Sequence, residues 1–294
     1  MAKLLPDWSR SRLQSWIEAH RVTLNGQSVI AKQKVWGGEC LQVSPQETIT
    51  STVHAAEAIS LNIVAEDDTL LVVNKPVGLV THPGNGNWQG TLLNALLHHA
   101  PQLEKVPRAG IVHRLDKDTS GLLVVAKTIE AQTNLVRQLQ QRTVRREYLA
   151  LVYGMLEQAG SVNAPIGRHP TQRTKMAISA KGKPAQTHYY ITETFQSCTL
   201  LRCILDTGRT HQIRVHMQSI HHPLVGDPVY CGKPQKIDAS VVQLLTGFPR
   251  QALHAQKLAL LHPKTGHSVT WEVEMPHDMQ QLLDLLRNRE SEAQ

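Results

Sequence analysis

One charged segment, residues 111–121, constrains the fold of this chain more than any other stretch. Five ionisable side chains fall within six positions there, from His113 to Asp118, and a Thr-Ser-Gly corner follows them. The uninterrupted apolar run 122–126 comes next and is typical of a buried strand. Because charges beside a buried strand lose hydration, we expect tightly coupled ion pairs with tuned ionisation. The alternative is a structural loop whose side chains satisfy backbone groups and one another.

The residues of this segment also match a known pattern. From His113 the chain reads His-Arg-Leu-Asp-Lys-Asp-Thr-Ser-Gly-Leu, which resembles the signature of pseudouridine synthases that modify large-subunit ribosomal RNA. The resemblance implies that Asp116 is the catalytic carboxylate. It also implies that Arg114 takes the place of a uridine flipped out of the RNA, and it places His113 among the substrate-binding residues.

A tyrosine-bearing strand is expected at 148–153. Alternation along an extended chain puts Tyr148 and Leu149 on opposite faces of that strand. Residues 146–152 resemble the family motif that supplies an active-site tyrosine. We therefore assign Tyr148 to stacking on the target base, with a further part in proton transfer at C5 left open.

A third motif covers residues 206–216, Asp-Thr-Gly-Arg-Thr-His-Gln-Ile-Arg-Val-His. The pattern predicts a glycine turn followed by a helix that Thr210 caps. Helical spacing predicts that His211 and Arg214 point in different directions.

The resemblance implies that Arg214 pairs with Asp116. A guanidinium can hold a carboxylate with two hydrogen bonds and keep it ionised where burial alone would raise its pKa. Arg209, in the same motif, is an alternative partner that the residues alone do not exclude.

Charge placement favours a nucleic-acid partner. The net charge is +7 and the pI is about 9.3, and no acidic residue lies between Arg168 and Tyr190. We predict one basic strip that contacts RNA phosphates without reading bases, although a solvated basic loop is the alternative. The residues assigned to RNA contact are Arg142, Arg145, Arg146, Arg168, Arg173, Lys175 and Arg209.

Residues 1–60 are expected to form a small module and a linker. Leu13, Trp16 and Ile17 repeat at helical spacing, and Asn-Gly at 25–26 predicts a tight hairpin. Helix, basic residues and hairpin resemble the S4 RNA-binding domain, while a structural cap is the alternative. Because an S4 domain normally has an earlier helix, we expect an N-terminally incomplete module.

Residues 61–294 are expected to form the catalytic domain. The resemblance covers most of 61–275 and implies an α+β fold, with a mixed, mainly antiparallel central sheet flanked by helices and loops. An amphipathic helix is predicted at 278–289.

No metal or nucleotide cofactor is expected. The four cysteines form no C-x-x-C pair, and the histidines between 211 and 222 follow no ligand spacing. The glycines at 84–90 do not match G-x-G-x-x-G. No stretch approaches the roughly 20 apolar residues of a membrane span. We expect a cytoplasmic monomer with reduced thiols, whose partner is large-subunit ribosomal RNA or a pre-ribosomal particle.

Two other classes of protein are weighed against a synthase. A glycoside hydrolase could use Asp116 and Asp118 as paired carboxylates, but we expect the two side chains to face apart, which argues against a shared site. A non-catalytic RNA-binding protein would not need Asp116, Tyr148 and Arg214 together. Within the family the likeness is to D-type enzymes, which act on a cluster of uridines in one stem-loop of 23S rRNA.

Overall fold

The structure is a computed structural model of the chain. It describes residues 1, 4, 5, 8, 10–45, 54–84, 87–172, 174–232, 237–239 and 241–293. Three features of the sequence analysis lie partly or wholly outside these ranges: Arg173, residues 46–53 of the expected linker, and residues 85 and 86 of the glycine loop.

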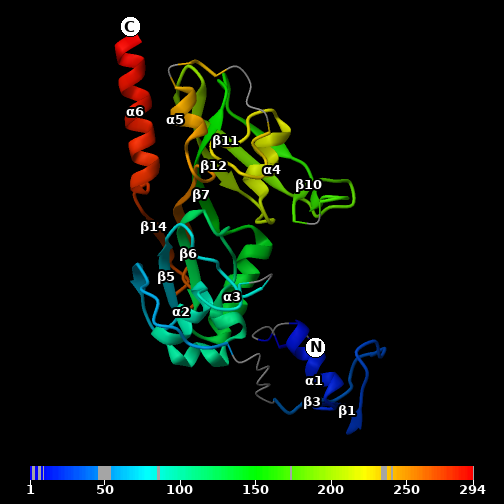
Figure 1. Cartoon of the computed structure of the whole chain (residues 1–294). Coiled ribbons are helices and arrows are strands. Elements are labelled where there is room, and N and C mark those ends of the chain that lie inside the picture. Colours follow the sequence, from blue (N-terminus) through cyan, green and yellow to red (C-terminus); the bar gives the residue numbers. More distant parts are fainter. Residues whose placement is uncertain are drawn as a thin grey trace.

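A long sheet forms the centre of the larger domain (Figure 1). Within the described residues its strands run in the spatial order β4 (Ile63–Glu66), β5 (Leu70–Lys75), β6 (Ser120–Ala126), β13 (Leu253–Leu261), β7 (Arg145–Tyr153), β12 (Cys198–Leu205), β11 (Gln186–Thr194) and β8 (Gly160–Asn163), with β14 (Ser268–Glu272) paired to β13. Of these pairings only β6 with β13 is parallel. The sheet is therefore mixed and mainly antiparallel, which confirms the predicted fold class.

Helices cover both faces of this sheet because the strands alternate two apolar sets. On one face, Tyr148 and Leu123 share a core with helices α2 (Leu92–His99) and α4 (Gln212–Ser219). On the other, strand side chains pack against α3 (Ile129–Gln141), α5 (Val242–Thr246) and α6 (His277–Ala293). Figure 1 shows α6, in red, beside α5. The two short 3₁₀ segments are η1 (Pro101–Lys105) and η2 (Pro107–Gly110).

The basic region 166–190 is partly strand. It contains β9 (Ile166–Arg168) and β10 (Met176–Ile178), which pair antiparallel, and the first half of β11. These strands carry little apolar alternation, so backbone pairing and not a buried face builds the hairpin.

The N-terminal residues form a small unit with its own core. Helix α1 (Arg10–Glu18) buries Leu13 and Trp16 against a three-stranded sheet. The strands are β1 (Val22–Leu24), β2 (Gln27–Ser28) and β3 (Leu41–Val43), in the order β2-β1-β3. Asn25 and Gly26 take positive φ, as the predicted two-residue hairpin requires. The helix and the hairpin are confirmed, and the likeness to an S4 domain stays a prediction.

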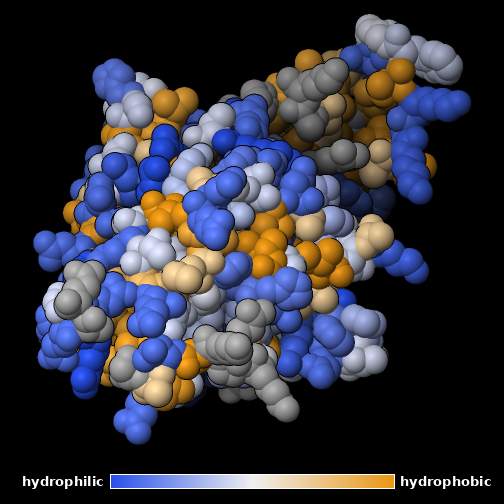
Figure 2. Space-filling view, turned by 90° about the horizontal axis from the view of Figure 1, so that it is seen from above, coloured by the Kyte–Doolittle hydropathy of each residue, from blue (hydrophilic) through white to orange (hydrophobic). Residues whose placement is uncertain are grey.

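The face of the molecule seen in Figure 2 is mainly polar. Figure 2 shows hydrophilic side chains over most of the face seen from above, with smaller hydrophobic patches between them. Within the described ranges, every helix is too short or too polar to cross a membrane.

Gly121 is required where the parallel pair begins. Its φ is +112°, and a Cβ at this position would collide with the backbone carbonyl of Ala255 on β13. We expect Gly121→Ala to lower the free energy of unfolding by about 2–4 kcal/mol. The new methyl group would overlap the backbone of Ala255, and the positive φ would strain the backbone of residue 121 itself. Activity should fall with it, because β6 begins directly after the segment that carries Asp116.

Gly266→Ala is the matched control for this prediction. Gly266 has φ +72° but faces open space, so only the strain remains, at a cost of about 1–2 kcal/mol. Chemical denaturation of both variants measures the difference. Equal losses of stability would show that the backbone contact at Gly121 contributes nothing.

Candidate active site

The segment that carries Asp116 is fixed by a buried lysine. Lys75, at the end of β5, is fully buried and donates from Nζ to the carbonyls of Pro76 (2.7 Å), Leu79 (2.9 Å) and Lys117 (3.0 Å). Burial lowers the pKa of Lys75 to about 8, against the opposing charges of Asp118 and Asp116. All three ammonium protons are thus used to hold the backbone next to Asp116.

An arginine holds the same segment from its other side. The guanidinium of Arg250 donates from Nη1 to the carbonyl of Asp118 (3.2 Å) and makes two hydrogen bonds, of 2.6 and 2.7 Å, to the carboxylate of Asp278. Sequence analysis assigned no role to Lys75 or Arg250. Neither stands within the charged segment, so only the folded chain brings them to it.

Asp116 contacts Arg214. Nη1 of Arg214 donates to Oδ2 of Asp116 at 3.0 Å, while Nε and Nη2 donate to the two oxygens of Asp227 at 2.7 and 2.9 Å. The two-bonded contact considered for Asp116 is therefore made with Asp227 instead. Burial by itself lowers the pKa of Arg214, but the hydrogen bonds and charges of Asp227 and Asp116 outweigh burial and raise it. The guanidinium stays charged beside Asp116.

Asp227 was missed by the sequence analysis. Its side chain is fully buried, and Oδ1 also accepts hydrogen bonds from the backbone N–H groups of Val229 (2.8 Å) and Tyr230 (3.0 Å). These donors and Arg214 together balance the buried charge. The signal available was an Asp between Gly226 and Pro228, a turn that predicts backbone contacts but no partner arginine.

Helix α4 begins differently from the prediction. The helix starts at Gln212, and its N-cap is His211, in the left-handed conformation (φ 57°), so the predicted cap at Thr210 was wrong. Because a left-handed residue redirects its side chain, His211 and Arg214 both face Asp116: Nε2 of His211 lies 3.9 Å from Oδ1. The prediction that these two side chains diverge was also wrong.

Tyr148 lies on the sheet face that carries this cluster. The side chain is buried, and within the described part of the chain its hydroxyl makes no hydrogen bond. Burial raises the pKa of Tyr148, with Arg146 opposing and Asp116 adding to the effect, so the side chain stays a phenol at neutral pH. The ring and a free hydroxyl are thus available beside Asp116.

Arg209 does not reach the carboxylate. Its Nε donates to the backbone carbonyl of Pro184 at 3.1 Å. Arg214 therefore occupies the position for which Arg209 was the alternative.

The arrangement is a carboxylate with one oxygen free of hydrogen bonds from the described residues, a buried cation and an aromatic ring. Such a set can attack or deprotonate a sugar and stack on a base. In the described part of the chain, no group of three or more His, Cys, Asp or Glu side chains is arranged to hold a metal.

Known proteins share this sequence and fold. The RNA pseudouridylate synthase family model matches residues 69–219, which include Asp116, Tyr148 and Arg214. The chain belongs to the RNA pseudouridylate synthase family. It is thus an enzyme that isomerises uridine in RNA, and the glycoside hydrolase and the non-catalytic binding protein are set aside.

Relatives of this synthase match nearly the whole chain. The "Ribosomal large subunit pseudouridine synthase D" of Nitrosomonas europaea is 61% identical over 98% of this chain and 83% of its own. The protein of the same name from Pasteurella multocida is 52% identical over 98% and 90%. Among solved structures, human RNA Pseudouridylate Synthase Domain Containing 4 is 26% identical, with a TM-score of 0.62, over 77% of this chain and 93% of its own.

Arg114 of the synthase is exposed at the edge of the cluster. The positive charge of Arg114 helps to lower the pKa of His82 and the pKa of His211, and burial is the larger cause for both. Burial, followed by the charges of Arg108 and Arg114, lowers the pKa of His82 to about 4. The edge of the cluster is therefore positively charged through Arg108 and Arg114, while His82 stays neutral.

His113 is held by the backbone of β6. Its Nε2 accepts a hydrogen bond from the N–H of Val124 at 3.1 Å, and burial, then the charge of Arg146, lowers its pKa to about 3. The unfolded chain takes up this proton near pH 6.5 and the folded synthase does not. Stability is therefore lost as pH falls below 6.5. At pH 5 we expect His113 to account for about 1–2 kcal/mol of that loss.

Urea unfolding at pH 7 and pH 5 tests this expectation. His113→Gln should lose less stability between the two pH values than the unsubstituted synthase does. His267→Gln, at an exposed histidine, is the control and should not change the difference. An unchanged pH dependence in His113→Gln would contradict the assignment of a neutral ring.

The predicted basic strip is divided by the sheet. Arg145 and Arg146 are neighbours on β7 and point to opposite faces. Arg146 is buried on the Tyr148 side, where it donates weakly to the carbonyl of Leu205 (3.4 Å), whereas Arg145 is exposed and contacts Glu147 at 2.6 Å. Arg145 lines a hollow of about 470 Å³ that also contains Arg202 and Lys257. These two arginines therefore do not belong to one surface.

The other predicted RNA contacts are exposed or half-buried side chains. Arg142 ends α3 in the left-handed conformation, and Arg168 and Lys175 lie on the β9–β10 hairpin. Their basic neighbours Lys181 and Lys183 are exposed as well.

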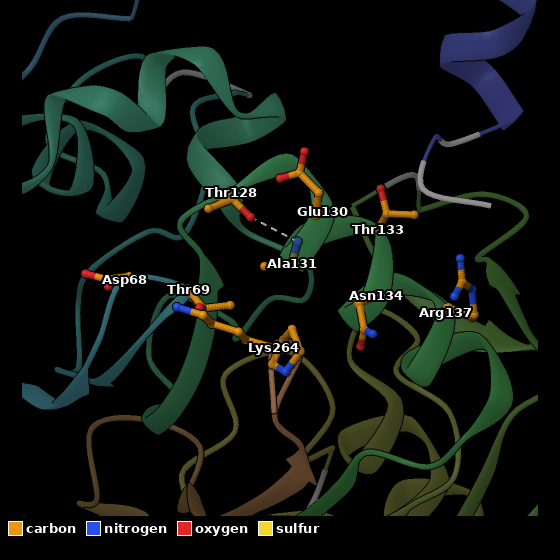
Figure 3. Close-up of a pocket in the computed structure, with 10 residues that line it drawn as sticks. Asp68, Thr69, Thr128, Glu130, Ala131, Thr133, Asn134, Arg137 and Lys264 are labelled. Carbon is orange, nitrogen blue, oxygen red and sulfur yellow. Dashed lines mark hydrogen bonds between the residues drawn. The ribbon is translucent and has the colours of Figure 1, made fainter. Parts of the chain in front are cut away.

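A separate hollow lies at the start of α3 (Figure 3). Its volume is about 350 Å³, and its lining includes Asp68, Glu130 and Lys264, while none of the predicted site residues lines it. The dashed line in Figure 3 marks the N–H of Ala131 donating to Thr128, at 3.1 Å, which caps the helix. Thr128 serves the helix end, and the lining of this hollow is separate from the Asp116 cluster.

Proposed function

We propose that this synthase converts uridine to pseudouridine in large-subunit ribosomal RNA, at a cluster of uridines in one stem-loop of 23S rRNA. The observation that carries the proposal is the Asp116–Arg214 contact beside Tyr148, in a chain 61% identical to a protein named for the large ribosomal subunit. The substrate is inferred from that name and from the basic character of the chain.

Asp116 is the catalytic carboxylate in this proposal. Its Oδ2 is occupied by Arg214, and Oδ1 is left for the ribose. The reaction breaks the N1–C1′ bond, rotates the uracil and joins C5 to C1′; C5 loses a proton and N1 gains one. Atoms therefore balance without any added reactant.

Two groups support the flipped base. Tyr148 offers its ring for stacking and its hydroxyl for the proton at C5, and exposed Arg114 fills the space that the base leaves in the RNA. Unstacking a base costs a few kcal/mol, which stacking of about 1–3 kcal/mol on an aromatic ring offsets. Arg142, Arg168, Lys175 and Arg209 contact phosphates of the RNA in this proposal, and Arg173 is assigned the same role from its place in the sequence. His113 holds the N–H of Val124 in β6.

Tritium release tests the substrate. Large-subunit rRNA, small-subunit rRNA and transfer RNA are each prepared with tritium at C5 of uridine and incubated with the synthase. Release from the large-subunit RNA alone is expected. Equal release from all three would contradict the assignment of the substrate, though not membership of the family.

The role of the carboxylate has two forms. Asp116 either attacks C1′ as a nucleophile or removes the C2′ proton to form a glycal. Substrate with deuterium at C2′ separates them, because only proton removal breaks that bond. A large isotope effect on tritium release supports the glycal route, and an effect near unity supports attack at C1′.

A further inference from the structure

His211 connects a tyrosine to the carboxylate. Its Nδ1 lies 2.8 Å from the hydroxyl of Tyr230, the two rings meet edge to face, and its Nε2 points toward Oδ1 of Asp116. Tyr230 also packs under the guanidinium of Arg214, at 5.0 Å. One residue in a left-handed conformation, His211, thus bridges two parts of the same cluster.

The hydrogen-bond pattern fixes which ring nitrogen carries the proton. The hydroxyl oxygen of Tyr230 accepts from the backbone N–H of Met176 at 2.8 Å. Among the described residues, His211 Nδ1 is the acceptor left for the hydroxyl proton, so Tyr230 donates to Nδ1. The neutral ring then carries its proton on Nε2.

That proton faces the free oxygen of the carboxylate. Oδ2 of Asp116 is taken by Arg214, and Oδ1 has His211 Nε2 as its neighbour at 3.9 Å, too long for a hydrogen bond in the free enzyme. Catalytic hydrogen bonds are often long before substrate binds and shorten in the complex. A small rotation of either side chain closes the gap.

We propose that His211 is a positioning residue for Asp116: Tyr230 fixes the Nε2–H form of the ring, which donates to Oδ1 when ribose is bound. With Arg214 on Oδ2, the plane of the carboxylate is then set by one donor on each oxygen. The inference rests on the proposed role of Asp116.

The charges around His211 agree with a neutral ring. Burial lowers its pKa; Asp116 and Asp227 oppose this, and Arg214 and Arg114 add to it. A protonated ring would also put a hydrogen on Nδ1, and the hydroxyl of Tyr230 would then lose its acceptor.

Tyr230→Phe tests the proposal. The substitution keeps the ring contacts with His211 and Arg214 and removes only the hydroxyl. We expect the single-turnover rate of tritium release to fall by about 10- to 100-fold, because the hydrogen bond from His211 to the charged carboxylate is then no longer held, with RNA affinity within about twofold. In ¹⁵N NMR spectra, Nε2 should be protonated in the unsubstituted enzyme, and Tyr230→Phe should populate both forms of the ring.

Matched variants separate positioning from folding. Tyr153→Phe also removes one buried hydroxyl, which donates to the Leu245 carbonyl (3.1 Å) on the other sheet face, and should leave the rate unchanged. His211→Gln can keep a donor near Oδ1 and should be faster than His211→Ala.

Three results would overturn the inference: an unchanged rate in Tyr230→Phe, protonated Nδ1 in the unsubstituted enzyme, or equal rates for the two His211 variants. If Asp116→Asn instead stays active, the proposed function itself fails, whatever the Tyr230 variant does.

Discussion

Asp116→Asn is expected to abolish isomerisation while leaving RNA binding intact. The amide has nearly the same shape but is a far weaker nucleophile and base, so tritium release should fall on the order of 10⁴-fold or more. The amide oxygen can still accept from Arg214, so the fold should be kept. Single-turnover tritium release and RNA affinity, measured on the same preparation, check both expectations.

Asp118→Asn is the matched control. Asp118 lies in the same segment, and it is the backbone carbonyl of Asp118, rather than its side chain, that contacts Arg250. This variant should keep most of the activity. Comparable losses in the two variants would indicate that general charge in the segment, and not the Asp116 carboxylate, drives the reaction.

Arg214→Met should destabilise the synthase by about 3–5 kcal/mol, because it leaves Asp227 charged and fully buried without its cation. Activity should be lost too, since Asp116 loses its hydrogen-bond donor. Urea unfolding and tritium release measure the two effects separately.

Adding Asp227→Asn to Arg214→Met separates stability from chemistry. Removing the orphaned charge should restore most of the stability, to within about 1–2 kcal/mol of the unsubstituted chain. Activity should stay low, because nothing then donates to Oδ2 of Asp116. A double variant that regains activity would contradict the role of Arg214, and one no more stable than Arg214→Met would contradict the buried pair.

The parts of the site that sequence could predict are those governed by local periodicity. The position of Tyr148 on one sheet face and Leu149 on the other follows from alternation, and the two residues do enter different cores. Thr128 is a typical N-cap residue, and helix α3 begins directly after it. The family motifs supplied Asp116 and Arg214, which neither composition nor charge could have paired across the chain.

The parts that sequence could not predict depend on backbone conformation or distant contacts. A left-handed His211 is not signalled by its residue type, yet it changes the direction of the side chain and brings it to Asp116. Asp227 and Lys75 act through partners that only the fold brings near. Arg145 and Arg146 looked alike as neighbouring cations, but strand alternation buries one and exposes the other.

Mapping pseudouridines in 23S rRNA from cells that lack the gene tests the central claim most directly. Deletion should remove a small cluster of pseudouridines in one stem-loop. A plasmid copy of the synthase should restore all of them, and a copy with Asp116→Asn should restore none. An unchanged map after deletion, or restoration by the Asp116→Asn copy, would contradict the account.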